Sequence, residues 1–119
     1  MPHIIIEYTN NIPSQSMRAA LTDAHTAFLA TAQAQPPRAL KGRAVCLDTY
    51  QMAEGLPSSA FVHVTLRLLP GRTPETKKSL IELILKTIAP HLPTHIPISL
   101  TGEVVEMPAE TYVKHEFNF

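Results

Sequence analysis

Hydrophobic residues along this chain follow two different periods, which alternate from the N terminus to the C terminus. Short runs rich in β-branched residues alternate as in a strand, and between them lie segments whose apolar residues recur every three or four positions, as in an amphipathic helix. The expected strands cover residues 3–8, 42–50, 60–69 and 98–105, and the expected helices cover residues 16–31 and 74–90. The order is strand, helix, strand, twice over.

Both expected helices carry local signals for their position. In the first helix Met17, Leu21 and Phe28 recur at helical spacing and form one apolar stripe. Before the second helix, Thr73 offers a hydroxyl for the N-cap and Pro74 occupies the first helical position. The eleven prolines of the chain fall mostly between the periodic segments. They therefore mark the ends of elements.

Each strand-helix-strand unit predicts a pair of parallel strands, because parallel neighbours need a long crossover connection, most often a helix. We expect two fused β-α-β units, at about residues 1–57 and 58–119, within a single domain. They would form one four-stranded mixed sheet with two helices on one face, an α/β (α+β) fold. A loop is expected at 54–59, and the last fourteen residues form a tail without a clear pattern.

Charge and cysteine content exclude several classes of protein. Ten basic and ten acidic residues balance without a block of like charge, which disfavours nucleic acid and membrane surfaces as partners. The single cysteine, Cys46, excludes an internal disulfide and fits a reduced compartment. No apolar run approaches the length of a membrane span, and no basic segment precedes one at the N terminus. We therefore expect a cytoplasmic protein.

Pro2 is the most informative single residue. If Met1 is removed, Pro2 becomes a secondary amine, which can take up protons or attack carbonyl carbons. Chain ends usually fray unless they are tied into structure, so the apolar run at 4–6 implies that this terminus is held inside the fold. The alternative is that proline simply follows methionine here and has no catalytic role.

Three segments of the sequence carry a resemblance to a known enzyme family. They are Pro2-His3 at the start of the first strand, residues 47–55, and residues 60–66, which run on into Gly71-Arg72-Thr73. Together they resemble 5-carboxymethyl-2-hydroxymuconate isomerase of the tautomerase superfamily, which also includes 4-oxalocrotonate tautomerase and proteins like macrophage migration inhibitory factor. The resemblance implies the tautomerase fold, a homotrimer, and catalysis by an N-terminal proline in the catabolism of aromatic compounds.

The implied reaction moves a double bond in a small anionic substrate, an unsaturated 2-hydroxy or 2-oxo dicarboxylate, by 1,3- or 1,5-proton transfer. A neutral amine can remove a proton from one position and return it to another, and an α-amino group titrates near 8. By analogy with the family, Pro2 would move the proton while Arg72 binds or polarises a carboxylate. Since these two residues lie in different units, the site must combine both units, within one chain or across a subunit boundary.

The second anion-binding position is open. The family pattern has Arg-x-Arg at the start of the second strand, where this chain has Lys41-Gly42-Arg43. Lysine supplies charge without the planar fork of arginine. Three functional explanations stay open: Lys41 performs the role less selectively, Arg43 or Arg38 replaces it, or the substrate differs from the dicarboxylated compound of the family. The alternative is that these residues merely solvate the edge of the sheet.

Other side chains favour structural roles. The six histidines include no pair at HxxxH spacing with a carboxylate between its two members, so we expect no metal, and we expect no organic cofactor. His63, within an apolar strand, is interpreted as a hydrogen-bonded structural histidine, and Cys46 is expected to pack rather than react.

The apolar content of the strands predicts that neighbouring subunits of the trimer cover the second face of the sheet. The apolar content of segments 4–6 and 62–69 exceeds what two short helices need, so neighbouring subunits should cover the rest. The tail, with Tyr112, Phe117 and Phe119, would reach over a neighbour's Pro2. Two other functions stay open, a broad keto-enol tautomerase of the phenylpyruvate type and a catalytically silent trimer used for binding or regulation.

Overall fold

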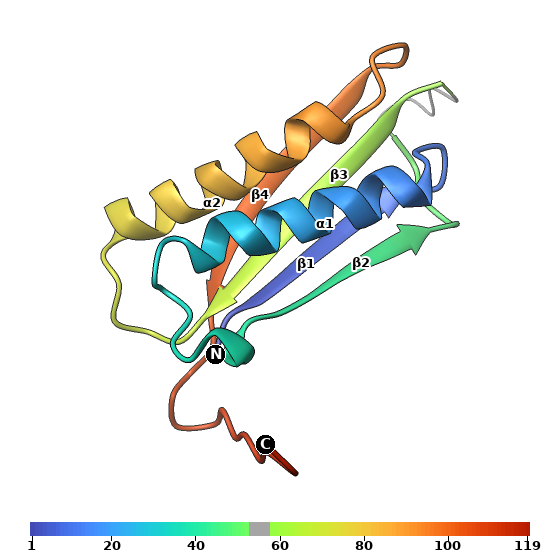
Figure 1. Cartoon of the computed structure of the whole chain (residues 1–119). Coiled ribbons are helices and arrows are strands. Elements are labelled where there is room, and N and C mark those ends of the chain that lie inside the picture. The colour runs from blue at the N-terminus through green and yellow to red at the C-terminus, as the bar shows by residue number, and fades with distance from the viewer. Residues whose placement is uncertain (53–57) are drawn as a thin grey trace.

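The computed structural model describes residues 1–52 and 58–119 of the chain. Its elements are β1 (His3–Thr9), α1 (Ser14–Leu29), a 3-10 turn (Pro37–Ala39), β2 (Lys41–Leu47), β3 (Ala60–Leu68), α2 (Pro74–Ile88), a second 3-10 turn (Ala89–His91) and β4 (Ile98–Glu106) (Figure 1). The expected order is confirmed, and element ends differ from the expected ones by at most three residues. Most of the loop expected at 54–59 lies outside the described residues.

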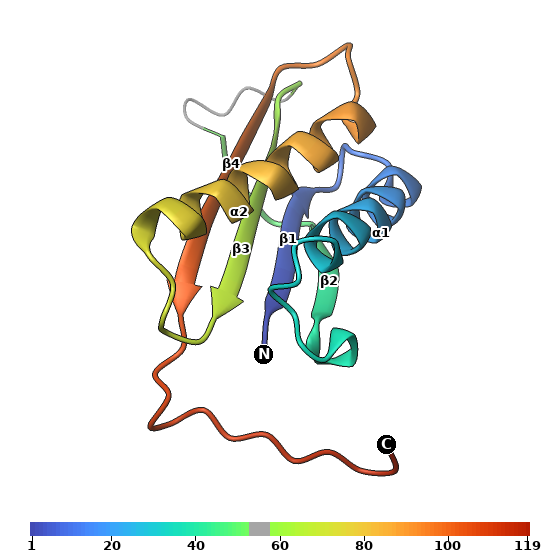
Figure 2. The same ribbon diagram turned by 60° about the vertical axis from the view of Figure 1, so that its left-hand side comes forward.

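The four strands form one mixed sheet in the order β2-β1-β3-β4. The pairs β1 with β2 and β3 with β4 are parallel, as the helical crossovers predicted, and the two units meet where β1 and β3 run antiparallel. Both helices lie on the same face of the sheet (Figures 1 and 2). This confirms the expected α+β fold, while the division of the chain at residues 57 and 58 stays a prediction.

The core lies between the two helices and the sheet. Alternate residues of the central strands point toward the helices, so Ile4, Ile6 and Val64 are fully buried there. The helices supply Phe28 and Ile84, which are also fully buried. At the start of α2 the predicted cap is present, since the Thr73 hydroxyl accepts a hydrogen bond from the backbone N–H of Thr76 at 3.1 Å.

The open face of the sheet, away from the helices, is mixed in polarity. Because side chains alternate between faces, Ile5 lies on the open face while its neighbours Ile4 and Ile6 lie under the helices. The same alternation and register place these charged residues on the open face: Glu7, Lys41, Arg43, Arg67 and Glu103. The argument that apolar residues of 4–6 and 62–69 need a second cover is therefore wrong, since the helices already bury most of them.

Two residues interpreted as structural have different outcomes. His63 lies on the open face, where its Nδ1 is 2.7 Å from the Thr101 hydroxyl and its Nε2 is 2.6 Å from a Glu103 carboxylate oxygen. This confirms the hydrogen-bonded histidine. Cys46 is exposed, so the expectation that it packs is wrong. It lies near the end of β2, which is the outer strand on that side of the sheet and has no second strand partner among the described residues.

Candidate active site

The strand pairing brings four chain segments to one end of the sheet. His3, at the start of β1, pairs with Lys41 at the start of β2 and with Arg67 near the end of β3. Leu68, the last residue of β3, pairs with Glu106, the last residue of β4. The N terminus, the start of β2, the turn after β3 and the C-terminal tail therefore share this end, which we call the N-terminal end of the sheet.

Pro2 is buried at this end. Its carbonyl oxygen accepts a hydrogen bond from the backbone N–H of Lys41 at 3.1 Å, which continues the β1-β2 ladder by one residue. Met1, which precedes Pro2 in the chain, is half-buried. The chain terminus is thus tied into the fold, as the apolar run after Pro2 predicted.

The electrostatic surroundings of the terminus favour a neutral amine. The pKa of the Met1 α-amino group is lowered from 8.0, first by burial and then by the charges of Arg72, Lys114 and Lys41. These three cations come from three separate segments: the turn after β3, the C-terminal tail and the start of β2. Arg72 and Lys41 were candidates from the sequence. Lys114 was not, since it lies in the tail, where no periodicity or motif marks it.

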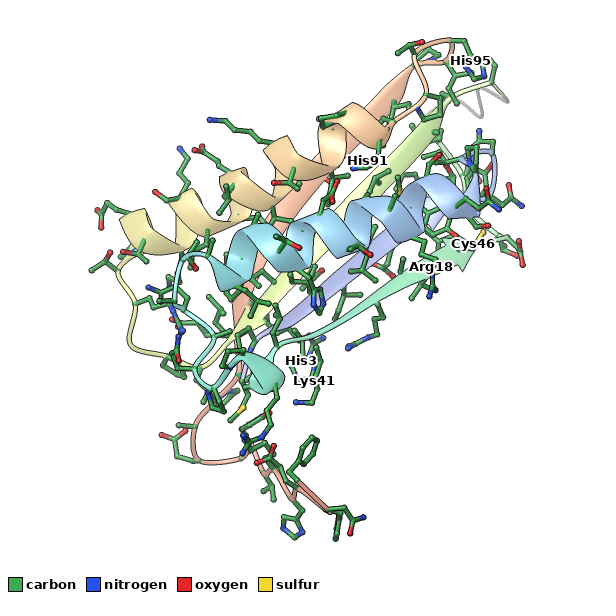
Figure 3. The ribbon with its side chains drawn as sticks, in the orientation of Figure 1. His3, Arg18, Lys41, Cys46, His91 and His95 are labelled. Atoms are coloured by element: carbon green, nitrogen blue, oxygen red, sulfur yellow. The ribbon has the colours of Figure 1, made fainter. Side chains whose placement is uncertain are left out.

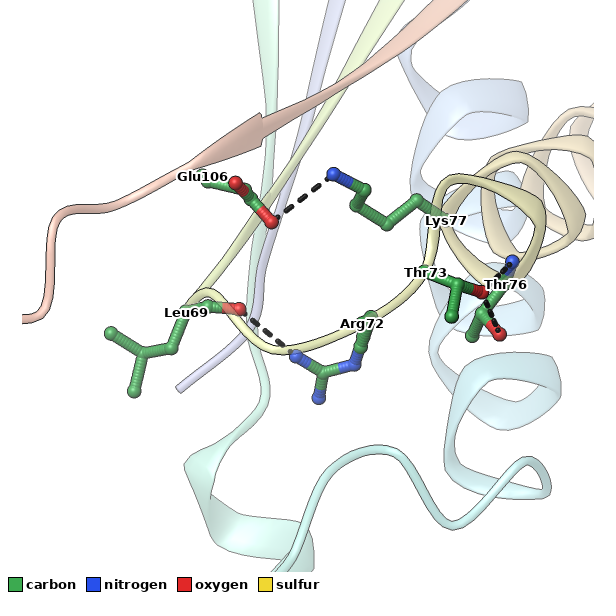
Figure 4. A network of polar contacts seen from close by, with 6 residues as sticks. All are labelled: Leu69, Arg72, Thr73, Thr76, Lys77 and Glu106. Carbon is green, nitrogen blue, oxygen red and sulfur yellow. Dashed lines mark hydrogen bonds and ion pairs between the residues drawn. The ribbon is translucent and has the colours of Figure 1, made fainter.

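Arg72 is held in one orientation by three hydrogen bonds. Its Nε donates to the Gln33 side-chain oxygen at 2.8 Å, and its Nη2 donates to the Gln33 carbonyl at 3.0 Å. Its Nη1 donates to the Leu69 carbonyl at 3.2 Å (Figure 4). Gly71, directly before it, has a φ of 127°, a conformation that favours glycine. A guanidinium has five N–H groups, so these contacts leave two for an anion.

The other three basic candidates occupy different places. Lys41 lies beside the terminus, with its Nζ 3.3 Å from the Ala39 carbonyl, and Figure 3 shows it next to His3. Arg43 lies two residues after Lys41 on β2 and on the same open face, with its Nη1 3.3 Å from Nδ1 of His3. Burial first, and then Arg43, lower the pKa of His3.

Arg38 belongs to the contacts of the tail. Its Nε is 3.5 Å from a Glu116 carboxylate oxygen, and its guanidinium lies 5.4 Å from the centroid of the Phe119 ring. The structure therefore brings Pro2, Arg72 and Lys41 together and leaves Arg43 and Arg38 to other partners.

The tail, residues 107–119, leaves β4 and passes below the N-terminal end of the sheet (Figure 2). Its start is fixed by a 2.8 Å hydrogen bond from the Met107 N–H to the Leu68 carbonyl. Further on, Nζ of Lys114 lies 3.2 Å from Sδ of Met1. The tail thus contacts the N terminus of its own chain, and its reach to a neighbouring subunit stays a prediction.

Two surface cavities lie between α1 and β2 rather than at Pro2. One of about 420 Å³ is lined by residues that include Tyr8, Arg18 and Ala44, and one of about 290 Å³ is lined by residues that include His25. Figure 3 shows Arg18 at the opposite end of the sheet from His3 and Lys41. Neither lining includes a residue of the N-terminal end other than those of β2.

Among residues 1–52 and 58–119 there is no group of three or more His, Cys, Asp or Glu side chains that could hold a metal ion. No helix within these ranges is long and apolar enough to cross a membrane.

Comparison with known proteins identifies relatives over nearly the whole chain. A family model described as 5-carboxymethyl-2-hydroxymuconate isomerase matches residues 2–117. The chain is 32% identical over 91 residues to the 5-carboxymethyl-2-hydroxymuconate Delta-isomerase of Escherichia coli, which covers 76% of this chain and 72% of the relative.

Solved structures share the fold. A crystal structure of a 5-carboxymethyl-2-hydroxymuconate isomerase from Deinococcus radiodurans R1 superposes with a TM-score of 0.87 at 27% identity, covering 98% of this chain and 90% of that one. A wild-type fused 4-OT, described as a symmetric trimer, superposes with a TM-score of 0.64 at 17% identity, covering 87% and 85% of the two chains. The second likeness concerns the fold alone.

Proposed function

The chain belongs to the 5-carboxymethyl-2-hydroxymuconate isomerase family and is an enzyme of the isomerase and tautomerase type, and from this premise we propose that it moves a double bond in an unsaturated 2-hydroxy or 2-oxo dicarboxylate, with Pro2 as the acid-base group. One observation carries the proposal. The N-terminal amine is partly buried, and three cations from separate segments lower its pKa.

Removal of Met1 places the amine on Pro2, about 3.8 Å further along the chain in terms of Cα positions. The same end of the sheet then supplies burial and positive charge to the proline nitrogen. In its neutral form this nitrogen has a lone pair, and it becomes the ammonium form after it has taken up one proton. Burial and the surrounding cations both disfavour a positive charge here, and this favours the neutral form of the amine.

The proposed reaction has two proton steps. The Pro2 nitrogen removes the hydroxyl proton of a 2-hydroxy substrate, or a carbon-bound proton of a 2-oxo substrate. An O–H or C–H bond breaks, an N–H bond forms and the electron pair enters a dienolate. The ammonium then returns the proton to another position of the conjugated system, which restores the neutral amine. The two available N–H groups of Arg72 hold a carboxylate or the developing enolate oxygen, and its three internal hydrogen bonds keep it oriented.

We also propose that the active form is a homotrimer. The outer edges of β2 and β4 have no strand partner within the described residues, and unpaired edges favour pairing with another chain. The fused 4-OT of the same fold is described as a symmetric trimer. A cytoplasmic location and a role in the catabolism of aromatic compounds belong to the same proposal.

The test of this function is a substrate comparison on protein whose mass shows that Met1 is absent. Isomerisation of 5-carboxymethyl-2-hydroxymuconate is followed by its ultraviolet absorbance, beside the enol-to-keto conversion of phenylpyruvate. This compound has three carboxylates and phenylpyruvate has one. A kcat/KM for 5-carboxymethyl-2-hydroxymuconate at least about tenfold above that for phenylpyruvate supports the proposal, since one more charge-assisted contact typically contributes that much. Absence of isomerisation above the buffer rate contradicts it.

A second function, a broad keto-enol tautomerase, is favoured by one specific observation. Three of the five N–H groups of Arg72 are engaged within the chain, and Lys41 stands where the family pattern has arginine. Such a site binds one carboxylate well and a second less selectively. In the same substrate comparison this function predicts equal or higher kcat/KM for phenylpyruvate.

A further inference from the structure

Lys114 is the residue of the tail that lies against the chain terminus. Its Nζ is 3.2 Å from Sδ of Met1, and about a quarter of its side chain, 26%, is exposed. The preceding stretch of the tail holds it there, since a turn follows Met107 in which the Tyr112 N–H donates to the Pro108 carbonyl at 3.0 Å. This cation is therefore positioned at the N-terminal end of the sheet by the fold of its own chain.

The charge around Lys114 is only partly balanced. Its Nζ lies 3.4 Å from one carboxylate oxygen of Glu116, and the other oxygen of Glu116 lies 3.5 Å from Arg38. Desolvation opposes the change, but the charges and hydrogen bonds of Lys114 and Arg38 lower the pKa of Glu116. One carboxylate is thus shared by two cations, while Arg72 and Lys41 add positive charge at the same end. This end of the sheet favours a ligand with more than one negative charge.

The contact with Met1 indicates where such a ligand would bind. A thioether sulfur is only a weak acceptor of hydrogen bonds, and Nζ of Lys114 has three N–H donors. Removal of Met1 takes this acceptor away from Lys114 at the moment when the Pro2 amine is formed. A carboxylate oxygen is a far stronger partner for an ammonium group than a thioether is.

We propose that Lys114 binds the second carboxylate of the substrate, while Arg72 binds the first, and that the tail thereby sets the preference of this enzyme for dicarboxylates. The proposal rests on the proposed function, because it assigns a role at the same site. It differs from the expectation that Lys41 or Arg43 would take this carboxylate. Lys114 and Arg72 come from separate segments, and both lie near enough to the terminus for their charges to act on its amine. A substrate with two carboxylates can therefore contact both.

The experiment compares three variants of the protein after removal of Met1. Lys114→Gln removes the charge and retains much of the side-chain volume, and Lys114→Arg restores the charge. Lys78→Gln removes an equivalent exposed charge from α2 and serves as the matched control. The kcat/KM of each is measured on 5-carboxymethyl-2-hydroxymuconate and on phenylpyruvate across pH.

We expect Lys114→Gln to lower kcat/KM for 5-carboxymethyl-2-hydroxymuconate by about tenfold to a hundredfold, the loss typical of one charge-assisted hydrogen bond. The value for phenylpyruvate should fall less than about threefold, since it has one carboxylate. The selective loss should persist on the high-pH plateau, where the amine is already neutral. Lys114→Arg should recover most of the activity, and Lys78→Gln should match the wild type. Equal losses on both substrates, or no loss on either, overturn the proposal.

A binding measurement separates this inference from the proposed function. Calorimetric titration with adipate and hexanoate compares a six-carbon dicarboxylate with a monocarboxylate of equal length, and it requires no catalysis. We expect Lys114→Gln to weaken adipate binding by about tenfold and to leave hexanoate binding unchanged. Equal adipate affinities in the wild type and the variant overturn the role of Lys114, whether or not the wild type isomerises the dicarboxylate.

Discussion

Replacing Gln33 with alanine removes one of the three hydrogen bonds that orient Arg72. The bond from Arg72 Nε to the Gln33 side chain is lost, while the bonds to the Gln33 and Leu69 carbonyls remain. A hydrogen bond to a charged group contributes about 1.5–3 kcal/mol, and solvent screening at this half-buried pair reduces that to about 1 kcal/mol. Gln33→Ala should therefore lower the free energy of unfolding by about 1 kcal/mol and Tm by a few degrees.

Gln33→Glu separates orientation from charge. A carboxylate at this position still accepts from Arg72 Nε, so the free energy of unfolding should be equal to or above that of the wild type. The added negative charge compensates the guanidinium, however, and this weakens binding of an anionic substrate. It also raises the pKa of the N-terminal amine, because one of the cations that lower that pKa is neutralised.

The assay is kcat/KM for 5-carboxymethyl-2-hydroxymuconate across pH, beside thermal unfolding of each variant. The amine acts as a base in its neutral form, so kcat/KM rises as pH passes upward through its pKa. For Gln33→Glu we expect about a tenfold loss at the plateau and a rise that begins at higher pH. Wild-type kcat/KM and an unmoved rise in Gln33→Glu would refute a role for the Arg72 charge.

Three further predictions concern the same molecule. Arg72→Ala should lower kcat/KM far more for 5-carboxymethyl-2-hydroxymuconate than for an uncharged enolisable ketone, whereas equal losses with intact stability argue against carboxylate binding. Gly102→Ala should lower the free energy of unfolding by about 1–3 kcal/mol, because its Cβ would lie 2.7 Å from Cγ1 of buried Ile81; an unchanged Tm beside a Ser99→Ala control would contradict this packing. Sedimentation at micromolar concentration should give about 39 kDa, three times the 13.1 kDa chain, and a monomer with full activity would contradict the trimer.

The elements of the fold could be predicted because burial on one face sets their periods. The run His3–Thr9 alternates between the helices and the open face, and Met17 and Phe28 lie on the buried stripe of α1. The end of β2 could not be predicted in this way. The pattern continues to Tyr50, but β2 pairs with β1 only as far as Leu47, opposite Thr9, where β1 itself ends. A strand ends where its partner ends, and this depends on a distant segment.

The candidate site was predictable in part for the same reason. Pro2 and Arg72 stood out through position and resemblance, and antiparallel pairing of β1 with β3 explains why they meet within one chain. Lys114 could not be predicted from the sequence, because its contact with Met1 joins residues 113 positions apart. The tail also has no hydrophobic periodicity that would indicate which way its side chains point. Cys46 was misplaced because its exposure depends on the sheet order, which leaves β2 at the edge.

The most direct test of the role of the Pro2 amine changes only the start of the chain. Two forms of the protein are compared, one that begins at Pro2 and one that carries a single glycine before it, each verified by intact mass. We predict that the glycine form loses at least about a hundredfold in kcat/KM, as expected on removal of the acid-base group, and keeps the same Tm and oligomeric mass. Equal activity of the two forms, or full activity in protein that retains Met1, would contradict the role of the Pro2 amine.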